Sequence, residues 1–321
     1  MIGRNVRLVF LAIAVLLLFA VNPAAAFYGE VDWVKINPNL KGAASINSID
    51  GCVECHADYI KLFNKSKHAK SIKYKSGDIG IQNTCEACHG PLSKHLEEPD
   101  LGKKLDSVIS FKTITPKQKS AICLQCHESE SRMHWRGSAH EMMGVSFDKC
   151  HYVMTKKSRK AMLISEDPKN SCFQCHKQQR SLMERTSHHP LREGKLSCTS
   201  CHNPHGGIGP KLLNTASVNE TCYQCHQEKR GPYIWEHPPV RENCSGCHEP
   251  HGSNLDSLLK IKMPYLCENC HSNTQHPSNI YDNRALGTRS GSLSRVIGKS
   301  CLNCHGMVHG SNHPSGARLT R

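Results

Sequence analysis

The sequence repeats one five-residue pattern, Cys-X-X-Cys-His, nine times, and these copies use eighteen of its nineteen cysteines. This spelling is the signature of covalent c-type haem attachment, in which two thiols add to the porphyrin vinyl groups and the histidine binds the iron from the proximal side. Disulfides and zinc sites also use paired cysteines, but neither requires a histidine after every second cysteine. We therefore predict a haem at each copy. The nine motifs hold Cys52, Cys55 and His56; Cys85, Cys88 and His89; Cys123, Cys126 and His127; Cys172, Cys175 and His176; Cys198, Cys201 and His202; Cys222, Cys225 and His226; Cys244, Cys247 and His248; Cys267, Cys270 and His271; and Cys301, Cys304 and His305.

The nineteenth cysteine, Cys150, also precedes a histidine, His151, but Phe147 stands where the first motif cysteine would be. We interpret "FDKCH" as a haem site with a single thioether bond, at Cys150, and with His151 as proximal ligand. Two attachment points still hold the porphyrin, and a missing haem would interrupt a chain of electron carriers. The alternative is an empty site with a free thiol.

The N-terminus predicts export. Arg4 and Arg7 precede an apolar run from Leu8 to Val21, and Ala24-Ala25-Ala26 supplies a cleavage signal, so residues 1–26 are interpreted as a signal peptide cut before Phe27. The alternative is an uncleaved anchor, but the apolar run is shorter than the ~20 residues that span a bilayer. Haem c is attached outside the cytoplasm, which agrees with export to the periplasm.

Composition agrees with a chain built around cofactors. Hydrophobic residues make up 38% of the sequence, against roughly 45–50% in ordinary domains. The porphyrins would then supply most of the core. The formal net charge of +14 could attract nucleic acid or acidic partners. Haem propionates would offset most of this charge, so we interpret the basic excess as propionate compensation and predict no nucleic-acid partner.

The motifs come in pairs. In each pair the first motif is followed by a long gap that contains a histidine, and the second motif is followed closely by another histidine. Successive pairs start 71, 49, 50 and 45 residues apart, so residues 27–321 are predicted to form one decahaem domain of five two-haem repeats. In this repeating pattern, Cys150 and His151 occupy the position of the second motif of the second pair. The pairs start at Cys52, Cys123, Cys172, Cys222 and Cys267.

Twelve of the twenty-two histidines lie outside the ten proximal positions. The repeat assigns nine of them as distal ligands, on the opposite side of the iron, and leaves His134, His188 and His313 over. The tenth distal position holds Met154, three residues after His151. Met154 is too near His151 to reach round the porphyrin at that site, so it would have to ligate a neighbouring haem. Either Met154 supplies a thioether ligand, which would raise that haem's potential, or His134 takes its place. The predicted distal ligands are His68, His95, His140, His189, His205, His237, His251, His276 and His309.

The stretches "CEACHGPLSKH", "HWRGSAH", "CTSCHNPHG" and "WEHPPVRENCSGCHEPHGS" resemble the MtrA/DmsE family of decahaem c-type cytochromes over essentially the whole chain after residue 26. The resemblance implies an elongated fold with little regular secondary structure, in which short α-helices surround a chain of bis-histidine haems. It also implies insertion into an outer-membrane β-barrel, porin-like partner, association with the outer membrane, and extracellular electron transfer with periplasmic and extracellular cytochromes. The family has Cys-X-X-Cys-His-X-X-His at the fourth haem, so Phe147 and Met154 both depart from it.

Two other functions compete with an electron conduit. A soluble periplasmic shuttle that feeds a reductase would need the same haems without a barrel. A multihaem reductase would need an iron with an open position, whereas here every motif ends in histidine and the distal candidates close almost every iron. We therefore predict electron transport by iron in haem, and no enzymatic activity.

Overall fold

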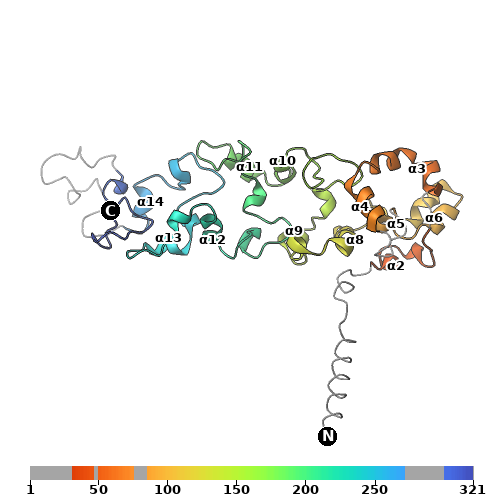
Figure 1. The fold of residues 1–321 in the computed structure, drawn as a ribbon, viewed down its shortest axis with the longest axis horizontal. Helices are drawn as coiled ribbons and strands as arrows, with labels where there is room; N and C mark the ends of the chain where they lie inside the picture. The colour runs from red at the N-terminus through yellow and green to blue at the C-terminus, as the bar shows by residue number, and fades with distance from the viewer. Residues whose placement is uncertain (1–30, 47–49, 76–84, 272–299, 321) are drawn as a thin grey trace, which may run out of the picture. The chain divides into compact units, whose positions relative to one another are not determined.

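The computed structural model describes residues 31–46, 50–75, 85–271 and 300–320, and the signal peptide predicted at residues 1–26 lies outside these ranges. The described residues contain short helices and no strand (Figure 1). Their only bridges are isolated antiparallel pairs: Ser187 with Ser253, His202 with Leu213, Trp235 with Ser311, and His248 with Leu259. The prediction of a multihaem cytochrome fold with little regular secondary structure and short α-helices is confirmed.

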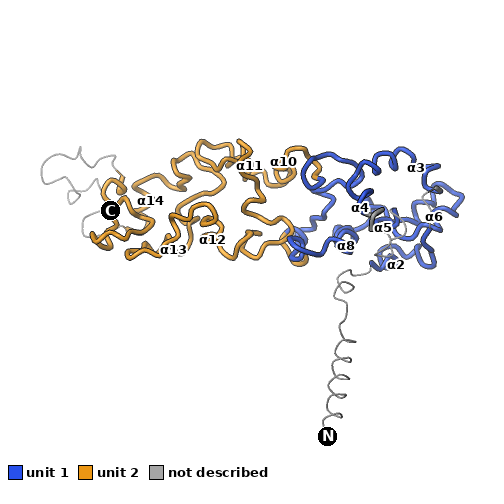
Figure 2. The backbone as a smooth tube through the Cα atoms, viewed as in Figure 1, with its two compact units in different colours: residues 1–135, 140–162 blue, residues 136–139, 163–321 orange. Residues whose placement is uncertain are grey.

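The chain divides into two compact units (Figure 2). Unit 1 comprises residues 1–135 and 140–162 and holds the first two motif pairs, while unit 2 comprises residues 136–139 and 163–321 and holds the last three pairs. The helix α9 (Ala139–Met142) begins in one unit and continues in the other.

In unit 1 the elements are α2 (Trp33–Ile36), η1 (Pro38–Leu40), α3 (Asp50–Phe63), α4 (Lys67–Lys75), α5 (Glu86–His89), α6 (Ser93–Glu97), α7 (Leu101–Lys104), η2 (Leu105–Ser107), α8 (Pro116–His127), η3 (Glu130–Arg132) and η4 (Phe147–Lys149). In unit 2 they are α10 (Pro168–Phe173), α11 (Lys177–Met183), η5 (Cys198–Ser200), η6 (Pro210–Leu212), α12 (Val218–Tyr223), η7 (Gln227–Lys229), α13 (Pro238–Glu242), η8 (Cys244–Gly246), η9 (Asp256–Leu258), α14 (Tyr265–Glu268) and η12 (Cys301–Asn303).

Local sequence signals start several of the helices that carry first motifs. Thr115 caps α8 in a capping box with Gln118, and Pro116 occupies its first turn. Asp167 caps α10 ahead of Pro168, and Ser217 caps α12 by accepting a bond from the Glu220 N–H. Because each helix ends at or near its motif, the capping residues fix where the first thiol of the motif lies.

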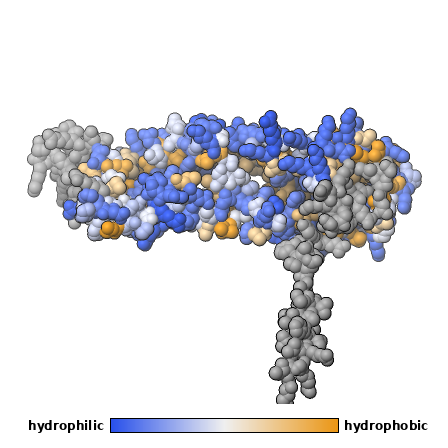
Figure 3. All heavy atoms as spheres, in the orientation of Figure 1, coloured by the Kyte–Doolittle hydropathy of each residue, from blue (hydrophilic) through white to orange (hydrophobic). Residues whose placement is uncertain are grey.

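The apolar core is small. In unit 1, one buried cluster contains Val31, Leu40, Ile109 and Ile122, and a second contains Leu124, Trp135 and Phe147. The face in Figure 3 is largely hydrophilic, with apolar side chains gathered in small patches. Clusters of this size suit a chain whose core is completed by cofactors.

Glycine is required directly after two of the predicted distal histidines. Gly252 has φ +140° and a Cβ there would lie 2.0 Å from the Leu182 carbonyl oxygen. Gly310 has φ +127°, and its Cβ would overlap the Tyr233 ring. Only glycine adopts these angles without strain and leaves room for the neighbouring chain.

Candidate haem centres

Six pairs of histidines lie with their ring centroids 5.8–6.4 Å apart, and each pair joins one motif histidine to one predicted distal histidine. An imidazole nitrogen binds a first-row metal at about 2.0 Å, and the ring centroid lies about 1.1 Å beyond it, so two axial imidazoles on one iron have centroids about 6.2 Å apart. The residues therefore fit a haem iron held between them. The pairs are His56 with His95, His68 with His127, His189 with His226, His202 with His251, His237 with His271, and His248 with His309.

The sequence alone did not predict which distal histidine faces which motif histidine. In the structure this pairing follows a regular shift between repeats. A distal histidine that follows a first motif meets the first-motif histidine of the next pair, as His68 meets His127, His189 meets His226 and His237 meets His271. The distal histidines that follow second motifs shift in the opposite sense, to the second motif of the preceding pair.

Two contacts show this backward shift. His251 meets His202 and His309 meets His248. His95 follows the second motif of the first pair, which has no predecessor, and it meets His56 of its own pair. Each ligand set thus ties together motifs that are distant in sequence. The predicted ligand His276 lies outside the described residues.

A backbone carbonyl orients the proximal histidine of every second motif. The Nδ1–H groups of these histidines donate to carbonyls 9 to 20 residues downstream, over 2.6–2.9 Å, which leaves Nε2 available to bind an iron. The bonds run from His89 to Ile109, His151 to Ala161, His202 to Lys211, His248 to Ser257, and His305 to Arg318.

Three of these carbonyls belong to backbone turns that the sequence did not reveal. Ala161 and Met162, Lys211 and Leu212, and Ser257 and Leu258 each form two successive residues with φ between +48° and +60°. The left-handed conformation costs a non-glycine residue about 1–2 kcal/mol, and such strain is retained at sites where it positions a functional group. No Gly or Asn marks these positions, so no ordinary turn signal could have identified them.

Burial favours the neutral form of several histidines at these positions. Loss of solvation lowers the pKa of His68, His151, His237 and His309. Burial also lowers the pKa of His89 and His202, although their carbonyl hydrogen bonds act in the opposite direction. A neutral imidazole has the lone pair that an iron ligand needs.

The Cys150 site has the geometry of a complete second motif. Cys150 follows the 3-10 turn η4 with φ −115°, as Cys201 follows η5 with φ −115° and Cys304 follows η12 with φ −113°. The His151 N–H donates to the Phe147 carbonyl over 2.8 Å, and the His202 N–H donates to the Cys198 carbonyl over 3.0 Å. Phe147 therefore occupies the backbone position of the first motif cysteine.

Neighbouring motifs bring their sulfur atoms together. The first cysteines of a pair share a hydrogen bond in four pairs: Cys52 with Cys85, Cys172 with Cys198, Cys222 with Cys244, and Cys267 with Cys301. In the second pair, Cys123 packs instead against the cluster that contains Phe147.

Cysteines of neighbouring pairs also interact. The second cysteine of one pair's second motif interacts with the second cysteine of the next pair's first motif. Cys88 interacts with Cys126, Cys201 with Cys225, and Cys247 with Cys270. If each sulfur formed a thioether at a porphyrin edge, haems attached at successive motifs within a unit would have adjoining edges. Among the described residues no cysteine forms a disulfide, and no cluster of three or more metal-ligating side chains forms.

The three histidines that the repeat left over have other surroundings. His188 bonds to the Arg185 carbonyl over 2.8 Å and to Glu193 over 3.1 Å, while the adjacent His189 faces His226. His313 accepts a bond from the Ser315 N–H, and His134 is exposed. The predicted distal ligands His140 and His205 both lie partly buried.

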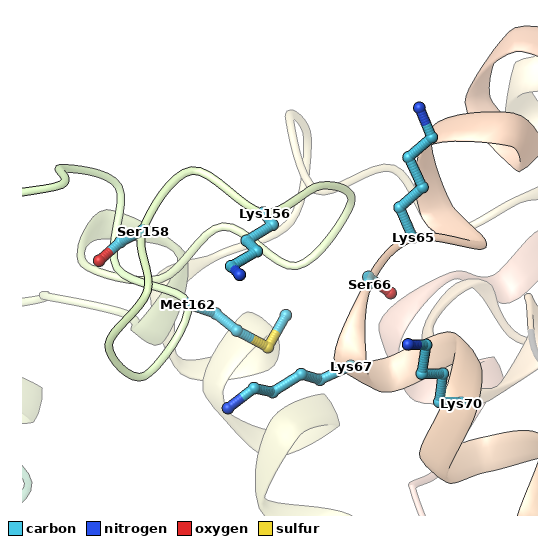
Figure 4. A pocket seen from close by; sticks show the side chains of 7 residues that line it. All are labelled: Lys65, Ser66, Lys67, Lys70, Lys156, Ser158 and Met162. Atoms are coloured by element: carbon cyan, nitrogen blue, oxygen red, sulfur yellow. The ribbon is translucent and has the colours of Figure 1, made fainter.

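A cavity of about 180 Å³ in unit 1 lies between the segment around His68 and the loop after His151. Its lining contains four lysines and no carboxylate, which makes it a place for anionic groups such as haem propionates. Figure 4 shows the Met162 side chain between Lys67 and Lys156. The lining residues are Lys65, Ser66, Lys67, Lys70, Lys156, Ser158 and Met162.

The chain is similar to known multihaem proteins. Residues 188–231 and 237–276 each match the family of the doubled Cys-X-X-Cys-His motif. The chain is 41% identical over 287 residues to multiheme cytochrome MtrA of Shewanella baltica, which covers 88% of this chain and 84% of the relative. It is also 30% identical over 118 residues to the cytochrome c-type protein NrfB of Haemophilus influenzae, with coverage of 35% and 46%.

Proposed function

Since the chain belongs to the MtrA/DmsE family of multihaem c-type cytochromes, which transfer electrons through haem, we propose that it carries electrons along ten haems across the periplasm and outer membrane. The proximity of thiols from successive motifs, which share hydrogen bonds within pairs and interact electrostatically between pairs, is the observation that supports this proposal most strongly. Adjoining porphyrin edges would allow electrons to pass between haems, and two axial side chains would hold each iron in a fixed ligand field.

The tenth haem is attached at Cys150 through one thioether, with His151 as proximal ligand. The η4 turn and the bond from His151 to the Ala161 carbonyl provide the same support as at intact second motifs. Phe147 fills the position of the lost thiol with a buried ring, so no second covalent bond can form there.

The partner is a porin-like β-barrel of the outer membrane. The part of the chain that the structure describes has no helix long and apolar enough to cross a bilayer. A hydrophilic chain can cross lipid only inside a protein that faces the hydrocarbon, and large barrels have polar lumens. Within the barrel the chain would exchange electrons with periplasmic cytochromes at one end and extracellular acceptors or donors at the other.

Two axial side chains per iron argue against catalysis, because a reductase needs an open iron for its substrate. We therefore propose a carrier without enzymatic activity. The test is purification of the tagged holoprotein from outer membranes in mild detergent. Recovery of a stoichiometric β-barrel protein supports the conduit, whereas recovery of the full pool from the periplasmic fraction without a barrel supports the soluble shuttle.

A further inference from the structure

The loop after His151 has the same backbone hydrogen bond as the loops that carry the predicted distal ligands His205 and His251. The N–H of the residue after the proximal histidine donates to the second residue of each left-handed turn: Tyr152 to the Met162 carbonyl over 2.8 Å, Asn203 to Leu212 over 2.8 Å, and Glu249 to Leu258 over 2.7 Å. In each loop the distal ligand position comes three residues after the proximal histidine. That position holds His205, His251 and, after His151, Met154.

The backward shift identifies which iron this position serves. His251 reaches the second motif of the preceding pair, at His202, and His309 does the same at His248. The second motif before His151 is that of Cys85, Cys88 and His89, within the same compact unit. Its own following histidine, His95, already faces His56.

We infer that Met154 is the distal ligand of the haem attached at Cys85 and Cys88, so that this iron is held by His89 and a thioether sulfur. This assignment rests on the proposed row of haems and names the ligand that distinguishes one of them.

The side chains on both sides suit this ligation. The His89 Nδ1–H donates to the Ile109 carbonyl over 2.8 Å, so its Nε2 is left available to bind an iron. Met154 is partly buried, whereas Met142 and Met143 are 77% and 80% exposed. Val153 and Thr155 replace the proline and glycine that flank His205 and His251, and an unbranched, flexible methionine can adapt to the altered turn.

A methionine ligand stabilises ferrous iron relative to histidine and raises the haem potential. The haem at Cys85 and Cys88 would then have a higher potential than it would with two histidine ligands, and it would hold an electron longer than a bis-histidine haem in the same place.

The test is the near-infrared absorption and magnetic circular dichroism of the oxidised holoprotein. A ferric haem with one sulfur and one nitrogen ligand has a charge-transfer band separate from that of a bis-histidine haem. We expect one such haem per molecule. Met154→His should convert its band to the bis-histidine type, and Met154→Ala should replace it with one high-spin haem that exogenous imidazole returns to low spin.

Met142→Ala is the matched control and should leave every band unchanged. Removal of the haem by Cys85→Ser with Cys88→Ser should abolish the sulfur band. A wild-type spectrum without a sulfur-ligand band overturns the assignment, as does a band that survives Met154→Ala. Appearance of one high-spin haem in His134→Ala would assign the site to the exposed histidine instead and also overturns it. Barrel co-purification is measured separately, so either result stands without the other.

Discussion

Phe147 stacks on Trp135 with ring centroids 4.1 Å apart and planes inclined by 29°. The pair sits where a thiol would otherwise meet Cys123, as first cysteines meet in the other four pairs. The lost anchor has thus been replaced by an aromatic contact rather than by a void.

The Cys150 site is predicted to hold haem in spite of this replacement. The intact exported protein should carry the mass of ten haems, and a proteolytic peptide that contains Cys150 should retain one. Phe147→Cys should add a thioether without adding a haem, and the unsaturated-vinyl component of the alkaline pyridine spectrum should disappear. Loss of the stack should lower thermal stability, since such pairs contribute about 0.5–1.5 kcal/mol beyond burial. Nine haems and an alkylatable Cys150 thiol would show the site to be empty.

The shift of ligands between repeats makes a second prediction. His68→Ala should open the iron at Cys123 and Cys126, because His68 faces His127 and not the histidine of its own pair. The ferric protein should gain one high-spin haem, measured by electron paramagnetic resonance. His188→Ala, which alters a histidine engaged by Glu193, should gain none. A high-spin signal that also survives deletion of the Cys123 and Cys126 haem would refute the pairing.

Gly252 should tolerate no side chain. Gly252→Ala places a Cβ against the Leu182 carbonyl and forces a left-handed angle, so we expect a loss of about 1–3 kcal/mol in unfolding free energy. Gly246→Ala is the control, because a Cβ there meets nothing within 4 Å. Thermal denaturation followed by circular dichroism measures both, and equal midpoints would contradict the role of Gly252.

The lysine cavity should raise the potential of a nearby haem. Cations favour the reduced state, which carries less positive charge, so Lys67→Gln with Lys156→Gln should lower one midpoint in a spectroelectrochemical titration. Lys112→Gln, on an exposed residue outside the cavity lining, should leave the titration unchanged. An unchanged titration in the double variant would mean that no haem lies against these lysines.

The sequence predicted the attachment sites because the haem motif is local, and it predicted the pairs because their spacing repeats. It also favoured His189 over His188, and the structure places His189 opposite His226. The ligand pairing could not be predicted, because His68 and His127 belong to different repeats and only the folded chain brings them together. The strained turn at Ala161 and Met162 was equally hidden, since tertiary contacts rather than residue preference hold these angles.

Electron transfer through the assembled conduit tests the central claim most directly. Vesicles containing the holoprotein and its co-purified barrel would be loaded with reduced methyl viologen, and ferric citrate would be added outside. We predict rapid oxidation of the internal dye that needs both proteins, and at least a tenfold slower rate (about 1.4 kcal/mol in barrier) when Cys198→Ser with Cys201→Ser removes an interior haem without preventing barrel binding. Dye oxidation at an unchanged rate in that variant, or none with the intact pair, would contradict the account.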